Sequence, residues 1–213
     1  MPKYGLINSK LLEVVLQNEE VFSKRGAMIA CRGKVNFARS FLGSGGVQDL
    51  AMRAVTNEGV DLMVANGNGQ VYYAFDGMHV TVINLHGETF YIESHSLLAF
   101  DRRLRVGTSF LGNQGGLQGL VRGAMTGQGL FTTTLDGHGE FAFVSDGDTI
   151  SLDVFPDKPI FVDPQAYVGH RGQITSSIAT DTSWKTFIGQ GSGESFQLKF
   201  TGSGTVYIQA SER

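Results

Sequence analysis

Apolar and polar residues alternate along much of the chain, and in three places the alternation follows the phrase Gly-x-Gly-x-Φ-x-Φ, in which Φ is an apolar residue. The three copies begin at Gly67, Gly137 and Gly202. A period of two residues is typical of a half-buried β-strand, whereas the apolar stripe of an amphipathic helix is hard to find in this sequence. Two close glycines permit positive φ angles and hence a sharp turn. Each copy therefore predicts a turn that leads into a strand.

The stretches that precede these phrases recur as well. Residues 11–31 align without gaps with residues 80–100, which in turn align with residues 150–170. In the first stretch, two apolar runs flank a polar segment at residues 17–20. The pattern predicts two strands joined by a turn at that segment.

Together these stretches define an internal repeat of about 65–70 residues, of which the third copy is the most divergent. A unit of that size buries its core poorly on its own, so we expect the copies to pack in a pseudo-threefold arrangement. No Pro- or Ser-rich linker separates them, which favours one integrated domain. The predicted fold is therefore all-β, with three tandem β-sandwich-like repeats over residues 11–77, 80–147 and 150–210 within a single domain spanning residues 1–213.

Composition narrows the classes of partner. With 41% hydrophobic and 17% charged residues, the 213-residue chain is ordinary for a soluble globular protein. Its formal net charge of −3 gives no general attraction to nucleic acid or anionic membranes, so either would need a local basic patch. The single cysteine, Cys31, excludes an intramolecular disulfide and favours a cytoplasmic location. We expect it to be a small buried side chain, and we expect no signal peptide and no membrane span.

Several short motifs stand in a fixed order along the chain. They are Arg25-Gly26-Ala27-Met28-Ile29-Ala30 with Gly33, Gly127-Gln128-Gly129-Leu130-Phe131, Gly137-His138-Gly139, Asp146-Gly147, Val162-Asp163 and the closing run of residues 200–209. The ordered set is similar to the altered-inheritance-of-mitochondria family, a bacterial and fungal family long described as a domain of unknown function. The resemblance spans residues 11–210 and implies a fold like that of the tryptophan RNA-binding attenuation protein, with β-sandwich units in threefold internal repetition. Fungal relatives are associated with the organisation of the mitochondrial inner membrane.

One predicted hairpin carries side chains that suit a metal ion. His86, Glu88, Glu93 and His95 lie on its two expected strands, and imidazoles with carboxylates are the usual ligands of zinc or iron. The other two repeats do not keep this set, and the His-x-His pair of a cupin barrel is absent from it. We therefore interpret the four side chains as solvated residues near the hairpin tip and expect no metal and no cofactor, while a cupin-like metal-dependent enzyme stays as a third hypothesis.

Nucleophilic and phosphate-loop chemistry find no support in the sequence. The chain has no Gly-x-Ser-x-Gly phrase and no Gly-x4-Gly-Lys-[Ser/Thr] phrase. No local basic or histidine-bearing motif accompanies Cys31 to lower the pKa of its thiol. An enzyme is therefore not the expected class.

A basic cluster is the remaining candidate site. Arg102, Arg103 and Arg105 are close in sequence, and Arg122 follows in the next connecting segment. Gathered on one rim, these guanidinium groups would bind phosphate groups of RNA or lipid, with the nearby phenylalanines available for stacking. The simpler interpretation is that they cover a strand edge and pair with Asp101 or Glu93.

The leading hypothesis is a non-enzymatic β scaffold that binds a partner protein or a small ligand. Its long connecting segments, which lead from each strand pair to the next Gly-x-Gly phrase and are nearly duplicated in the first two repeats, are the expected binding surface. Binding of RNA or an anionic surface is the alternative, and an oligomer is compatible with either hypothesis.

Overall fold

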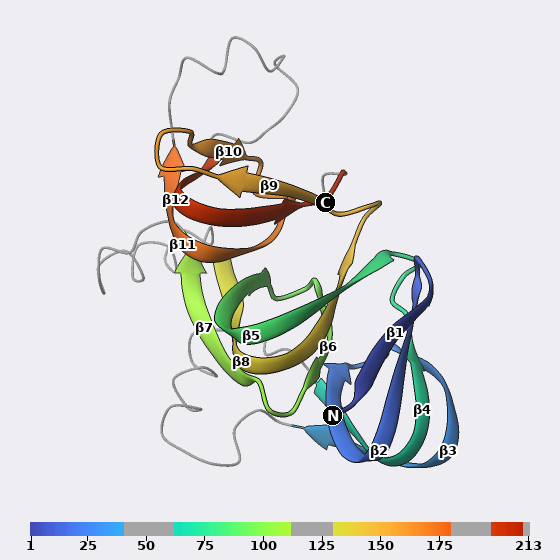
Figure 1. Ribbon diagram of the computed structural model, residues 1–213. Helices are drawn as coiled ribbons and strands as arrows, with labels where there is room; N and C mark the ends of the chain where they lie inside the picture. The colour runs from blue at the N-terminus through green and yellow to red at the C-terminus, as the bar shows by residue number, and fades with distance from the viewer. Residues whose placement is uncertain (41–61, 112–129, 180–196, 211–213) are drawn as a thin grey trace.

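The computed structural model describes residues 1–40, 62–111, 130–179 and 197–210. Their regular structure consists entirely of β-strands, so the all-β prediction is confirmed (Figure 1). Within these ranges the chain has no helix with the length and apolar character that a membrane crossing requires.

The strands fall into three consecutive groups along the chain (Figure 1). The first group is β1 (Lys3–Asn8), β2 (Leu11–Lys24), β3 (Met28–Ser40) and β4 (Leu62–Tyr73). The second is β5 (His79–Glu93), β6 (Leu97–Asp101), β7 (Arg105–Leu111) and β8 (Leu130–Ser145). The third is β9 (Ile150–Val154), β10 (Ile160–Val162), β11 (Tyr167–Ala179) and β12 (Gln197–Ile208).

All of these strands belong to one antiparallel sheet. Its main order is β10-β12-β11-β5-β8-β6-β2-β4-β3, with β1 on β2, β7 on β8 and β9 on β12. In each group the last strand is flanked by the earlier ones: β4 by β2 and β3, β8 by β5, β6 and β7, and β12 by β9, β10 and β11. The contacts β2–β6 and β5–β11 join one group to the next.

The turn predicted at residues 17–20 is wrong, because β2 continues through this segment as one strand. Its register with β4 shifts between Gln17 and Glu19, and Asn18 takes a φ of 65°. In β5 the register with β8 likewise shifts between His86 and Thr89. One residue with positive φ makes a β-bulge, which bends a strand without reversing it.

The Gly-x-Gly phrases lie inside long strands and do not precede them, so the predicted turns are also corrected. Gly67 and Gly202 lie within β4 and β12, with φ angles of 130° and 116°. A Cβ added at Gly67 would lie 2.2 Å from the carbonyl oxygen of Lys34, and one at Gly202 would lie 2.1 Å from that of Gln173. Glycine is required because the backbones of two bent strands approach too closely there for any side chain.

The buried apolar side chains form three clusters. The first combines Leu12 and Val71 of the first group with Leu98 and Val144 of the second. The second cluster adds Val168 of β11 to phenylalanines of the second group. Side chains from neighbouring strand groups therefore pack into a shared core. This core fixes the position of the corner between β6 and β7.

Cys31 is exposed, so the prediction of a small buried side chain is wrong. It lies on β3, the last strand at one end of the sheet. An end strand has a neighbour on one side only, and its side chains receive less cover than those of a central strand.

Candidate functional site

Arg102, Arg103 and Arg105 lie at the corner between β6 and β7, and their side chains reach three different carboxylates. The chain turns there, and the N–H of Leu104 donates to the carbonyl oxygen of Asp101 over 3.0 Å. In the aligned copies, Arg102 is replaced by Gly33 and Gly172, which lie inside the uninterrupted strands β3 and β11.

Close backbone packing explains why only the second group breaks its strand here. A Cβ added at Gly33 would lie 2.6 Å from the carbonyl oxygen of Asn68, and one at Gly172 would lie 2.7 Å from that of Ser203. An arginine does not fit such a crossing. The chain instead leaves the ladder at residue 101 and returns to it at residue 105, forming the arginine corner.

Asp101 and Arg103 form the central pair of the corner. The Asp101 side chain is only 3% exposed. Its Oδ1 accepts from the backbone N–H of Arg103 over 2.9 Å and from Nε over 3.0 Å, while Oδ2 accepts from Nη2. The hydrogen bond to Asp101 raises the pKa of the Arg103 guanidinium. The pair is fork-like, and the buried carboxylate is satisfied by the guanidinium.

The other two arginines also have carboxylate partners. Arg105 donates to Asp136, which accepts a further hydrogen bond of 2.8 Å from the hydroxyl of Thr89. The bond from Arg105, followed by that from Thr89, lowers the pKa of Asp136. Arg102 Nε lies 3.1 Å from Oε2 of Glu20 on β2 and so connects the second group to the first. Arg122, the fourth predicted residue, lies outside the described residues.

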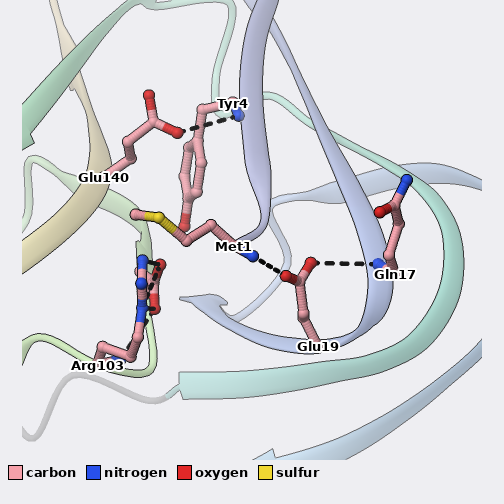
Figure 2. A network of polar contacts seen from close by, with 7 residues as sticks. Met1, Tyr4, Gln17, Glu19, Arg103 and Glu140 are labelled. Atoms are coloured by element: carbon pink, nitrogen blue, oxygen red, sulfur yellow. Dashed lines mark hydrogen bonds and ion pairs between the residues drawn. The ribbon is translucent and has the colours of Figure 1, made fainter.

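A second polar network adjoins the corner on the side of β1 (Figure 2). The N–H of Tyr4 donates to Oε2 of Glu140 over 3.4 Å, and Glu19 accepts from the Met1 amino group and from the backbone N–H of Gln17. The hydroxyl of Tyr4 is buried and has no hydrogen-bond partner among the described residues. Burial, followed by the charge of Asp101, raises the pKa of Tyr4 well above its usual value, so the phenol stays neutral.

The predicted histidine and glutamate set does not form a site. Glu88 accepts from the backbone N–H of His86 over 2.7 Å, and Glu93 accepts from those of His95 and Ser96 over 3.0 and 2.9 Å. Glu88 therefore holds the bulge within β5, which is one continuous strand here and not the predicted hairpin, while Glu93 holds the turn that follows β5. Across the described part of the chain, no three or more His, Cys, Asp or Glu side chains lie close enough to hold a metal ion.

The partners of the arginines were not predicted, apart from Asp101. Asp136 lies opposite Arg105 in the β7–β8 ladder, whereas the aligned positions in the first group are the neutral pair Asn36 and Asn66. Comparing the aligned stretches could have found this pair, because Arg105 and Asp136 carry opposite charges where the first group has two neutral residues. Nothing in the sequence pattern singles out Tyr4, because β1 precedes residue 11, where the aligned stretches of sequence begin.

Comparisons with known proteins place this architecture in context. A family model described as mitochondrial biogenesis AIM24 matches residues 4–211. The crystal structure of protein SPYM3_0169 from Streptococcus pyogenes is similar, with a TM-score of 0.72 and 20% sequence identity, and the match covers 100% of this chain and 94% of that one. Among proteins with curated descriptions, none matches the chain.

Proposed function

The chain belongs to the mitochondrial biogenesis AIM24 family, and on that premise we propose that it is a non-enzymatic β scaffold that binds a partner protein or a small ligand. The observation that carries this proposal is the pairing of the charged side chains at the arginine corner. Each of its three arginines is paired with a carboxylate of the same chain. The corner is thus built to join strands and groups, and it supplies neither a free nucleophile nor a free base.

The scaffold in this proposal consists of three copies of one unit, arranged with pseudo-threefold symmetry like the tryptophan RNA-binding attenuation protein. Its support is the shared pairing scheme, in which the last strand of each group is flanked by the earlier ones. A second support is that Val71, Phe141 and Val206, which follow the three Gly-x-Gly phrases, are all fully buried. Equivalent residues with equivalent burial are expected of copies of one unit.

The binding surface in this proposal is the set of connecting segments, which lie outside the described residues. Each segment leaves and re-enters the sheet between two paired residues, so its ends are held side by side. These pairs are Ser40 with Leu62, Leu111 with Leu130, and Ala179 with Gln197. A loop whose ends are fixed by a ladder can vary in sequence without disturbing the strands, as is typical of binding loops.

The test is an affinity capture with the full chain and with a variant in which residues 41–61 and 112–129 are replaced by short Gly-Ser links. Circular dichroism would check that the variant keeps its strands. We expect quantitative mass spectrometry to find proteins that the full chain retains and the variant loses. Equal recovery of every protein by both chains would contradict the role of these segments.

Binding of RNA or an anionic surface remains the second candidate, favoured by one observation. The side chains of Arg102 and Arg105 are 64% and 82% exposed, although both are ion-paired. If they bind phosphate groups, replacing Arg102, Arg103 and Arg105 with alanine should weaken binding of single-stranded RNA and reduce its dependence on salt. Equal binding by both proteins at low salt would eliminate the corner as a phosphate site.

A further inference from the structure

Two strand pairings join the three strand groups within the described residues, and they have the same register. In the first joint, between β2 and β6, Phe22 lies opposite Phe100. In the second joint, between β5 and β11, Tyr91 lies opposite His170. In the aligned repeats, Tyr91 takes the place of Phe22 and His170 takes that of Phe100. Both pairs stack, with ring centroids 5.1 Å and 4.5 Å apart. One contact is thus used twice within the chain.

The strands that would make this contact a third time lie at the two ends of the sheet. The alignment places Phe161 of β10 at the position of Phe22 and Tyr91, and Cys31 of β3 at the position of Phe100 and His170. The strand order begins with β10 and ends with β3. In Figure 1 these two strands are far apart, with β10 at the top of the molecule and β3 at the lower right.

Burial at the end strand differs from burial at the two joints. Leu98 on β6 and Val168 on β11 are both 0% exposed, and each packs into the core of the preceding group. The aligned residue on β3, Ile29, is 57% exposed, and Met28 beside it is also exposed. Two apolar side chains on β3 therefore lack the cover that their counterparts receive from a joint.

We propose that copies of this chain associate head to tail, with β10 of one copy adding to β3 of the next in the register of the two internal joints. Phe161 of one copy then faces Cys31 of the other, Ile160 faces Arg32, and Val162 faces Ala30. Such an interface uses two different patches, so it generates a ring if the rotation closes and a filament if it does not. It would extend the sheet by the pairing already used within the chain.

The chemistry of the two ends is complementary. Ile29 and Met28 supply apolar surface to the core below β10, and an aromatic ring opposite a thiol is a favourable contact. At the second joint Arg171 lies 3.7 Å from Glu88. Arg32 occupies the aligned position of Arg171, but the position aligned with Glu88 is Lys158, so this ion pair is not repeated. The joint between copies would therefore depend on backbone pairing and on the apolar contacts of Met28 and Ile29.

The inference goes beyond the proposed function, because self-association through strand ends can hold whether or not the connecting segments bind a partner. Its test uses the native thiol. Phe161→Cys places a second thiol opposite Cys31 across the proposed joint, at a separation that suits a disulfide. We expect mild oxidation to give covalent species beyond the dimer on non-reducing gels. Mass spectrometry should identify a peptide containing Cys31 joined to the introduced cysteine of another copy.

The matched control is Ile178→Cys, because Ile178 and Phe161 are both 39% exposed and Ile178 does not lie on β10. Its cross-linking should be at least tenfold weaker. Ile29→Lys, at an exposed position, should shift the mass in sedimentation from that of an oligomer to the 23.0 kDa of one chain. The proposal would be overturned if the wild-type chain sediments as a monomer. It would also be overturned if the disulfide forms within one chain, joining its own β10 to its own β3.

Discussion

The ring of Tyr91 lies parallel to the imidazole of His170, with centroids 4.5 Å apart and an interplanar angle of 1°. The hydroxyl of Tyr167 lies 2.8 Å from Nδ1 of His170, so the imidazole is buried between a ring and a hydrogen-bond partner. Burial lowers the pKa of His170 to about 4. The joint between the second and third groups therefore contains a histidine that is neutral throughout the physiological pH range.

This relationship predicts a specific dependence of stability on pH. Because the pKa of His170 in the folded chain lies below that of an unfolded histidine, about 6.5, the unfolded state takes up a proton first as the pH falls. The stabilisation from the neutral histidine should be complete above pH 6.5 and decrease by up to about 3 kcal/mol between pH 6.5 and pH 4. Urea denaturation across this range measures it.

The control for this prediction is His170→Phe, which copies the aromatic residue found at the aligned Phe100. The variant keeps a ring beside Tyr91 but cannot be protonated. Its free energy of unfolding should change less with pH than that of the wild-type chain. Identical pH profiles for the two proteins would show that His170 titrates normally in the folded state.

The glycines within long strands lead to a second prediction. Gly202→Ala would bring a Cβ within 2.1 Å of the carbonyl oxygen of Gln173 at a φ of 116°. Gly26 has a φ of 82° but no atom within 4 Å of an added Cβ. We expect Gly26→Ala to cost about 1 kcal/mol from backbone strain alone and Gly202→Ala about 3 kcal/mol or more from strain plus overlap. Equal losses in thermal or urea unfolding would mean that the crossing strands separate easily.

The all-β class could be predicted from the sequence because the alternation of apolar and polar residues is a local pattern. It does not distinguish a turn from a bend inside a strand, since Asn18 and Gly67 would suit either. The neighbouring strands determine which of the two forms. Because β4 lies beside both β2 and β3 over most of its length, Gly67 is held within a continuous ladder. That long-range pairing is absent from any local pattern, and it explains why the predicted turns were wrong.

The candidate site could also be predicted only in its local part. The clustering of Arg102, Arg103 and Arg105 follows from their closeness in sequence, and pairing with Asp101 was one of the two readings. The ion pair of Arg102 with Glu20 depends on the joint between the first and second groups. Such a contact brings together residues far apart in the chain, and only the packed structure supplies it.

The arginine corner gives a third prediction, in which two neighbouring arginines differ. Arg103→Ala would leave the Asp101 carboxylate, which is 3% exposed, without its guanidinium partner. Breaking a fully buried pair costs about 3–5 kcal/mol, and the partial exposure of Arg103 reduces the expected loss to about 2 kcal/mol. Arg105→Ala removes a partner from the exposed pair with Asp136 and should change stability little. Urea denaturation of the two variants measures the difference, and a larger loss for Arg105→Ala would contradict it.

The stacked pair at the first joint gives the last prediction. Phe22 and Phe100 have centroids 5.1 Å apart and an interplanar angle of 10°, and each comes from a different strand group. A double-mutant cycle with leucine at each position should give a coupling energy of about 1 kcal/mol, because stacked rings contribute beyond the area they bury. The same cycle between Phe22 and Phe200, which belong to different core clusters, should give a value near zero. If the two cycles agree, the backbone ladder alone holds the first and second groups together, and the recurrence of stacked rings at both joints contributes nothing to their stability.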